Sequence, residues 1–208
     1  MITLSNYLKS YANRTVLSIE ELKIDAGLHL VTGVNGSGKT TLFKSISGII
    51  HFKGSCTVDG INLKTNPINY RSYVNYCEAE PNFPSFLTGK ELIRFVGKTK
   101  NTPDSVLDNI VELFGVTAFW TQPVSTYSSG MLKKTALVLS FTGNPKVVLL
   151  DEPFTTIDKP GKKQLCKVIK EYGSQGCTFL MSAHQEVETI PLDFDSTLVL
   201  EHNTAVKR

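Results

Sequence analysis

Hydrophobic and polar residues follow two different periods along this chain, and together they predict both strands and helices. Four mainly apolar runs of strand length lie at residues 28–31, 146–150, 178–182 and 197–200. Near residues 159–172, apolar residues recur every three or four positions, as they do along one face of a helix. Strands that alternate with helices are typical of an α/β fold with a mostly parallel sheet.

The N-terminal part of the chain departs from this alternation. Within residues 1–32 and 54–63, short apolar runs are separated by turn signals such as Asp25-Ala26-Gly27 and Asp59-Gly60. Short runs joined by tight turns favour antiparallel pairing over helical crossovers. We therefore expect an N-terminal antiparallel β patch in addition to the mostly parallel sheet.

The middle of the chain departs in the other direction, toward helix. Residues 91–96 and 106–114 carry helical periodicity, and Gly115 then has the position of a helix stop signal. Because this helical stretch interrupts the strands, it predicts an inserted α-helical lobe. The expected single domain covers residues 1–208, with a nucleotide-binding core of 1–83 and 146–208 and a helical subdomain of 84–145.

A glycine-rich segment follows the first of the buried strands. Residues 33–40 read Gly-Val-Asn-Gly-Ser-Gly-Lys-Thr, which satisfies the phosphate-binding pattern G-x-x-x-x-G-K-[ST]. The glycines let successive main-chain N–H groups point inward around an anion, and Lys39 adds a charge that reaches the β- and γ-phosphates. The Thr40 hydroxyl is a hard oxygen ligand of the kind that Mg²⁺ prefers. The residues expected to contact the nucleotide here are Asn35, Gly36, Ser37, Gly38, Lys39, Thr40 and Thr41.

A helix is expected to begin directly after this segment. Leu42, Ile46 and Ile49 lie at i, i+4 and i+7, which places them on one helical face. The N-terminus of a helix carries roughly half a positive charge and therefore favours a bound phosphate. Strand, loop and helix arrive in the order of a P-loop NTPase core, so the sequence predicts binding of a nucleoside triphosphate.

A second motif supplies carboxylates. The apolar run 147–150 is followed at once by Asp151 and Glu152. A strand that ends in an acidic residue delivers its carboxylate at the edge of the sheet where the phosphate-binding loop also lies. Asp151 is expected to hold Mg²⁺, directly or through water. Glu152 is expected to face an attacking water molecule and polarise it, which makes it the candidate catalytic base.

Bulk properties exclude several classes of protein. The net charge of +3 is too small to indicate a nucleic acid or a lipid surface as partner, and no nucleic acid is expected. The four cysteines form no C-x-x-C pair, so we expect buried, reduced thiols in a cytoplasmic protein. No signal peptide is expected, because residues 1–5 have no basic start and no apolar h-region, and no membrane span is expected, because the longest purely aliphatic run is only 147–150. Any transmembrane partner is therefore expected to be a separate chain.

The third motif narrows the class of nucleotide-binding protein. Residues 127–131 read Tyr-Ser-Ser-Gly-Met, just over twenty residues before Asp151. This segment resembles the L-S-G-G-Q signature of the nucleotide-binding subunits of ATP-binding-cassette (ABC) transporters, and the other motifs follow in that family's order. The resemblance implies that Ser128, Ser129 and Gly130 grip the γ-phosphate of ATP held by a second subunit. Ser129 is the departure with a consequence, because it adds a Cβ where the family's main chain approaches phosphate.

Further roles are implied by the same resemblance. His184, after residues 178–182, is similar to the switch histidine that senses the γ-phosphate. Residues 155–158 resemble the D-loop that crosses the dimer interface, which assigns Asp158 to the site; the alternative is a plain helix-start turn. Tyr11 lies about where the family places an aromatic ring that stacks on adenine.

One expected motif is altered. The family usually places a Gln or Glu after a strand, in the Q-loop, where it meets Mg²⁺ and the membrane partner. Ala79 aligns with that position here, and a methyl group ligates nothing. Either Glu78 or Glu80 replaces it through a shift of one residue, or the contact is absent.

These expectations leave more than one function open. The first is an ATP-hydrolysing ABC subunit that forms a homodimer or heterodimer around ATP and drives a separate transmembrane subunit. Residues 88–92 resemble members that serve exporters. The alternative is a soluble ABC-type ATPase that acts on nucleic acid or ribosomes, although relatives of that class usually carry a coiled coil or two cassettes. A GTPase or kinase is disfavoured, because no N-K-x-D motif follows the match to D-x-x-G at residues 158–161.

Overall fold

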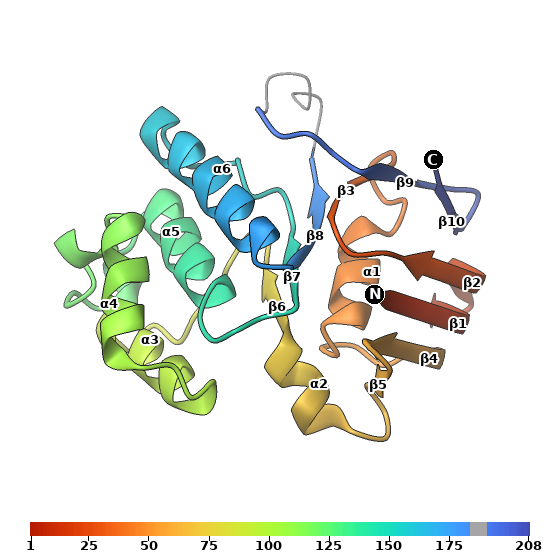
Figure 1. Ribbon diagram of the computed structural model, residues 1–208, viewed down its shortest axis with the longest axis horizontal. Helices are drawn as coiled ribbons and strands as arrows, with labels where there is room; N and C mark the ends of the chain where they lie inside the picture. Colours follow the sequence, from red (N-terminus) through yellow and green to blue (C-terminus); the bar gives the residue numbers. More distant parts are fainter. Residues whose placement is uncertain (184–190) are drawn as a thin grey trace.

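The computed structural model describes residues 1–183 and 191–208, and a six-stranded sheet runs through its centre (Figure 1). In their spatial order the strands are β10 (Thr204–Lys207), β9 (Ser196–Glu201), β3 (Leu28–Thr32), β8 (Thr178–Ser182), β7 (Val147–Leu150) and β6 (Val74–Cys77). Every neighbouring pair is parallel except β9 and β10. The mostly parallel sheet predicted from the apolar runs is confirmed.

Both faces of this sheet are covered at its centre, which explains why β7 and β8 are mainly apolar. Every residue of β7 and β8 is buried. Val148 and Leu150 belong to the hydrophobic cluster beneath the helical lobe, whereas Val147 and Leu149 belong to the cluster beneath α1 (Lys39–Ile46) and the antiparallel sheet. A strand that is buried on both faces cannot show alternation, so it reads as a continuous apolar run.

The predicted antiparallel patch is confirmed as a second sheet on the side away from the helical lobe (Figure 1). Its strands, in order, are β2 (Arg14–Ile24), β1 (Ile2–Tyr11), β4 (Lys53–Val58) and β5 (Ile61–Asn62). The Asp59-Gly60 turn joins β4 to β5 with positive φ at both residues, 48° and 80°. The first two strands form one long hairpin, which is more extended than the short apolar runs indicated.

Helices cover the face of the central sheet that lies opposite α1 and the antiparallel sheet. Those on this side are α3 (Gly89–Thr99), α4 (Asp104–Leu113), α5 (Ser129–Ser140) and α6 (Lys159–Ser174), with short 3-10 turns at Val116–Ala118 and Val124–Thr126. The three helical stretches predicted from periodicity are confirmed by α3, α4 and α6. Gly115 follows α4 with a left-handed φ of 66°, as its predicted role as a stop signal requires. Figure 1 shows α3, α4 and α5 grouped at one end of the molecule.

The helix after the glycine-rich loop is shorter than predicted. α1 ends at Ile46, and Gly48 then takes a left-handed φ of 75°. Ile49 consequently leaves the helical face and is 55% exposed, so its assignment to that face was wrong. A further helix, α2 (Pro67–Tyr73), had no periodic signal, because Tyr70 is its one buried residue.

The four cysteines, Cys56, Cys77, Cys166 and Cys177, are all buried and free, as expected. In the part of the chain that the structure describes, no helix has both the length and the apolar character needed to cross a membrane.

Candidate nucleotide-binding site

The glycine-rich loop connects β3 to α1 and curls back on itself. Gly33, Gly36 and Gly38 all have positive φ, at 154°, 77° and 104°. A Cβ on Gly33 would lie 2.7 Å from the main-chain oxygen of Leu200, and one on Gly38 would lie 3.0 Å from the Leu17 side chain, which would have to move. Gly33 is therefore required for both conformation and space, and Gly38 mainly for conformation.

The start of α1 is available to an anion. Gly38 is its N-cap and supplies no side-chain hydrogen bond, so the first N–H groups of the helix have no side-chain cap. Lys39 is 7% exposed, and its Nζ donates to the carbonyls of Gly33 at 2.7 Å and Val34 at 3.3 Å. The ammonium group thus lies within the loop, where a phosphate oxygen can replace a carbonyl as its acceptor.

The carboxylate predicted after β7 lies beside this loop. Asp151 is 1% exposed, and its Oδ2 accepts hydrogen bonds from Thr40 Oγ1 at 2.7 Å and from the Tyr76 hydroxyl at 3.2 Å. Its Oδ1 accepts one from Ser182 Oγ at 2.5 Å. Burial, followed by the nearby Asp151 charge, raises the pKa of Tyr76, so this phenol remains a donor. The sheet therefore brings together the two residues that the sequence assigned to Mg²⁺.

Glu152 follows directly and has an unusual main-chain conformation. Its φ is 47°, in the left-handed region that non-glycine residues seldom occupy. Its N–H donates to Ser182 Oγ at 3.0 Å, so the same hydroxyl holds both acidic residues of the motif. This conformation turns the chain at the end of β7, and Glu152 becomes part of the cleft lining.

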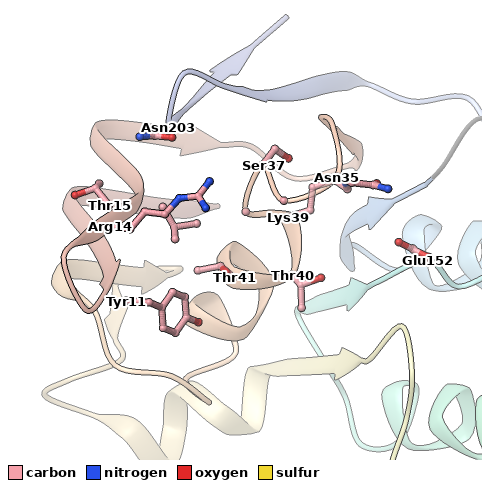
Figure 2. A pocket seen from close by; sticks show the side chains of 13 residues that line it. Tyr11, Arg14, Thr15, Asn35, Ser37, Lys39, Thr40, Thr41, Glu152 and Asn203 are labelled. Carbon is pink, nitrogen blue, oxygen red and sulfur yellow. The ribbon is translucent and has the colours of Figure 1, made fainter.

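A cleft of about 610 Å³ surrounds the loop (Figure 2). Its lining residues are Tyr11, Arg14, Thr15, Val16, Asn35, Gly36, Ser37, Gly38, Lys39, Thr40, Thr41, Glu152 and Asn203. Figure 2 shows Tyr11 and Arg14 toward one end, Lys39 and Thr40 in the middle, and Glu152 at the other end. This volume lies within the range of roughly 300–1,000 Å³ that is usual for small-molecule sites. The arrangement suits an elongated ligand with a ring at one end and phosphates at the other.

Tyr11 is the aromatic residue at the far end of the cleft, and its side chain is 49% exposed. The Lys9 ammonium lies 4.5 Å from the centre of the ring. An exposed ring face at the open end of a phosphate-binding cleft can stack on a nucleobase.

Signature residues lie outside this cleft. Ser128 is the N-cap of α5, and its Oγ accepts from the Met131 N–H at 3.3 Å. Gly130 packs so closely on the next motif that a Cβ there would lie 2.9 Å from the carbonyl oxygen of Thr156. Ser128, Ser129 and Gly130 are absent from the cleft lining, so the described fold does not bring them to their own phosphate-binding loop.

Asp158 also lies away from the cleft lining and caps a helix. It is the N-cap of α6, where its Oδ1 accepts from the Gly161 N–H at 3.2 Å. The Lys134 ammonium lies 3.3 Å from Asp158 Oδ1 and holds the pKa of that carboxyl below its usual value. The structure thus contains the helix-start turn that the sequence left as an alternative. His184 lies outside the described residues.

The altered Q-loop follows β6. Glu78 pairs with Lys44 at 3.7 Å, so its side chain points to α1, while Glu80 is exposed. The main-chain oxygens of Glu78 and Ala79 both accept hydrogen bonds from the Lys133 ammonium. Within the described residues, the carboxylates of Glu78 and Glu80 make no hydrogen bond to Asp151 or Thr40.

Several residues of the site carried no assignment from the sequence. Tyr76 and Ser182 reach Asp151 from strands on either side of β7. Ser182 could have been found, because it is polar and ends a buried strand at the same sheet edge. Arg14 and Asn203 had no signal, since only tertiary structure brings the β1–β2 and β9–β10 turns to the loop.

Known proteins resemble this chain over most of its length. The family model described as ABC transporter matches residues 20–155. A protein of Pyrococcus furiosus that is described as an ABC transporter ATP-binding protein is 30% identical over 215 residues, covering 100% of this chain and 79% of its own. The lantibiotic transport ATP-binding protein SrtF of Streptococcus pyogenes is 27% identical, covering 90% of this chain and 82% of its own.

A solved structure described as an ATP binding subunit of an ABC transporter has the same fold. It superposes with a TM-score of 0.90 at 22% identity, and the match covers 100% of this chain and 89% of that chain. This likeness shows the fold, and the match of the family model to residues 20–155 together with the 30% identical relative shows the family. The chain belongs to the ABC transporter family, and it is an ATP-binding domain of the kind that hydrolyses ATP.

Proposed function

We propose that this chain is an ATPase subunit that dimerises around ATP and drives a separate membrane-spanning partner, in the export direction. The observation that carries its catalytic part is the buried Asp151 carboxylate, whose Oδ2 lies 2.7 Å from the Thr40 hydroxyl beside the phosphate-binding loop. In P-loop NTPases a loop hydroxyl and such a carboxylate together hold the Mg²⁺ that neutralises charge during phosphoryl transfer, so this pair supports ATP hydrolysis.

Within one subunit, the cleft assigns a role to each end of ATP. Tyr11 stacks on adenine, and the loop from Asn35 to Thr41 cradles the phosphates, with Lys39 on the β- and γ-phosphates. Glu152 polarises the attacking water and accepts its proton. These roles follow from the order of the residues along the cleft in Figure 2.

The donor set beside the loop fits Mg²⁺. Thr40 and Asp151 supply one hydroxyl and one carboxylate oxygen, both hard ligands. Among the described residues, no group of three or more His, Cys, Asp or Glu could hold a metal. Two protein ligands suit an ion that is bound mainly by nucleotide phosphates. Mg²⁺ would supply positive charge that stabilises the negative charge on the β- and γ-phosphates.

The second subunit is inferred from where the signature lies. Ser128–Gly130 stand at the capped start of α5 but do not line their own cleft. Residues that grip a γ-phosphate must therefore reach the ATP of another subunit, either a second copy or a related chain. Asp158, beside the Thr156 carbonyl that Gly130 approaches, belongs to the same interface.

The resemblance also assigns γ-phosphate sensing to His184. His184→Ala should therefore slow hydrolysis and leave ATP affinity unchanged, and a wild-type rate of hydrolysis would remove that role.

A membrane partner and export follow from the family and from residues 88–92. Relatives include a protein whose name describes lantibiotic transport. Export is tested in inside-out vesicles that contain this chain and its membrane partner: ATP added outside should drive substrate into the lumen. Movement of substrate out of the lumen would reverse the assignment.

Light scattering on Glu152→Gln protein, with and without Mg-ATP, tests the dimer. Blocking proton transfer should trap the closed state, so we expect the mass to double when Mg-ATP is added. Adding Ser128→Ala should reduce the dimer fraction, because it removes a hydroxyl from the γ-phosphate grip. Thr88→Ala is the matched control, since Thr88 caps α3 in the same way but lies outside the signature.

The outcomes separate the alternatives. A dimer that survives Ser128→Ala as well as it survives Thr88→Ala would place the interface elsewhere. A Glu152→Gln protein that binds ATP and stays monomeric would contradict a homodimer and leave a related chain as the required partner.

A further inference from the structure

A lysine inside the signature helix is completely buried, and the roles described above do not use it. Lys133 lies in the second turn of α5 and is 0% exposed. Burial lowers the pKa of its ammonium group, because the charged form loses its hydration. A lysine is almost never buried this fully unless its charge is paired or hydrogen-bonded. What Lys133 contacts therefore decides what it does.

Its ammonium group is bonded to main chain alone. Nζ donates to the carbonyl oxygens of Glu78 and Ala79, both at 2.8 Å, and of Asp151 at 3.2 Å. An ammonium group has three N–H donors, so these three acceptors use all of them. Among the described residues, no carboxylate lies within 4.0 Å of Nζ. The cation is thus stabilised by carbonyl dipoles, and it forms no ion pair with an acidic side chain among the described residues.

These three carbonyls belong to two separate segments of the site. Glu78 and Ala79 follow β6, at the position where the family places its Q-loop side chain, and Asp151 follows β7. The Ala79 methyl group cannot reach the metal edge, but its carbonyl is joined to Asp151 through a single ammonium group. Lys133 therefore connects the altered Q-loop, the carboxylate edge and the helix whose N-cap is Ser128.

We propose that Lys133 is a positioning residue for ATP hydrolysis, which rests on the function proposed above. It fixes the main chain at Ala79 and Asp151 relative to α5, and so holds the segment after β6 and the carboxylate edge against the signature helix. When Ser128 engages the γ-phosphate of the second subunit's ATP, the same helix holds Glu152 in line. Lys133 itself touches neither nucleotide nor metal.

Steady-state ATP hydrolysis by Lys133→Met tests this assignment. Methionine keeps the length and apolar volume of the side chain but removes all three donors. We expect kcat to fall roughly 10- to 100-fold, as small displacements of catalytic groups do. KM, and ATP affinity measured in the Glu152→Gln background, should stay within about threefold, because ground-state binding is unchanged.

A matched control lies on the same interface between β6 and α5. Asn75 is buried, and its Nδ2 donates to the carbonyls of Ser140 at 2.9 Å and Thr142 at 2.8 Å, at the opposite end of α5. Asn75→Leu also leaves buried carbonyls without their donor, so it should lower the melting temperature as Lys133→Met does. Its kcat should remain within about twofold of the wild-type value if the effect of Lys133 is positional.

Each result decides a different point. Equal kcat values for Lys133→Met and Asn75→Leu would contradict the positioning role of Lys133. They would not contradict the proposed function, because the wild-type protein would still hydrolyse ATP. A wild-type protein that binds ATP without hydrolysing it would contradict the proposed function itself.

If Lys133→Met does not fold, Lys133→Arg is the deciding variant. Its planar guanidinium keeps the charge but cannot converge on three carbonyls, so kcat should still fall. Wild-type kcat for Lys133→Arg would contradict the proposal.

Discussion

At the scale of single residues, the site depends on how a buried carboxylate is stabilised. Asp151 accepts hydrogen bonds from three hydroxyl groups, those of Thr40, Tyr76 and Ser182. A buried carboxylate without partners is strongly unfavourable, so these donors are needed for the fold. None of them is a cation, and the negative charge therefore remains available to a metal.

Lys39→Ala should weaken ATP binding by roughly 10- to 100-fold, because a hydrogen bond to a charged group contributes about 1.5–3 kcal/mol. Isothermal titration with ATP measures the change. Lys44→Ala is the control, since it removes the same charge from α1 at a position that pairs with Glu78 outside the cleft lining. Equal affinities for the two variants would show that the loop lysine does not contact phosphate.

Glu152→Gln should retain ATP binding and lose turnover by about 100-fold or more, because an amide cannot accept the proton of the attacking water. Phosphate release under saturating Mg-ATP measures this loss. Glu171→Gln changes the charge equally at an exposed position on α6 and should hydrolyse ATP at the wild-type rate. Near-normal release from Glu152→Gln would assign the base to another residue.

At the scale of elements, the helices differ in how their N-termini are satisfied. α3, α5 and α6 are capped by the side chains of Thr88, Ser128 and Asp158. α1 begins after Gly38 with no side-chain cap, as do α2 after Asn66 and α4 after Pro103. An uncapped helix start keeps its N–H donors and its positive end for a ligand, so the absence of a cap at α1 is consistent with phosphate binding there.

Thr88→Ala should lower the free energy of unfolding by about 1 kcal/mol, the usual effect of losing an N-cap. Thr88 Oγ1 accepts from the Glu91 N–H at 3.2 Å, and Glu91 Oε2 accepts from the Thr88 N–H at 2.8 Å. Urea denaturation measures the change, with ATP affinity as the second readout. A large loss of affinity would contradict the separation of this cap from the nucleotide site.

At the scale of the whole molecule, two hydrophobic clusters hold the site between them. The helical lobe packs over one face of the central sheet, and α1 with the antiparallel sheet packs over the other (Figure 1). The phosphate-binding loop and Asp151 lie at the edge of the sheet between these layers. Both clusters contain cysteines, so thiol accessibility reports on each.

Native protein at pH 8 should react slowly with iodoacetamide at every cysteine. Burial raises the pKa of Cys56 to about 11 and those of Cys77 and Cys177 to about 12, so the reactive thiolate is scarce. All four thiols should react in guanidinium chloride. Because unfolded thiols ionise near pH 9, their contribution to stability is present below that pH and declines above it. Rapid labelling of a native thiol would show local opening of its cluster.

Most of the elements could be predicted from local sequence, and the exceptions have physical reasons. The strands β7 and β8 are recognisable because a sheet that is covered on both faces demands unbroken apolar runs. Ile49 was misplaced because its spacing continues the helical period, while the left-handed Gly48 ends the helix first. α2 was missed because it buries only Tyr70, and one buried residue gives no period.

The sequence alone determined the phosphate-binding loop, the acidic pair and the signature, because each is a contiguous run whose spacing is set by local geometry. Only the tertiary structure decided that Tyr76, Ser182 and Lys133 surround Asp151. Those three residues come from β6, β8 and α5, and hydrophobic periodicity does not specify which strands become neighbours. Strand order is fixed by long-range packing, so the contacts that complete the site emerge only when the sheet is assembled.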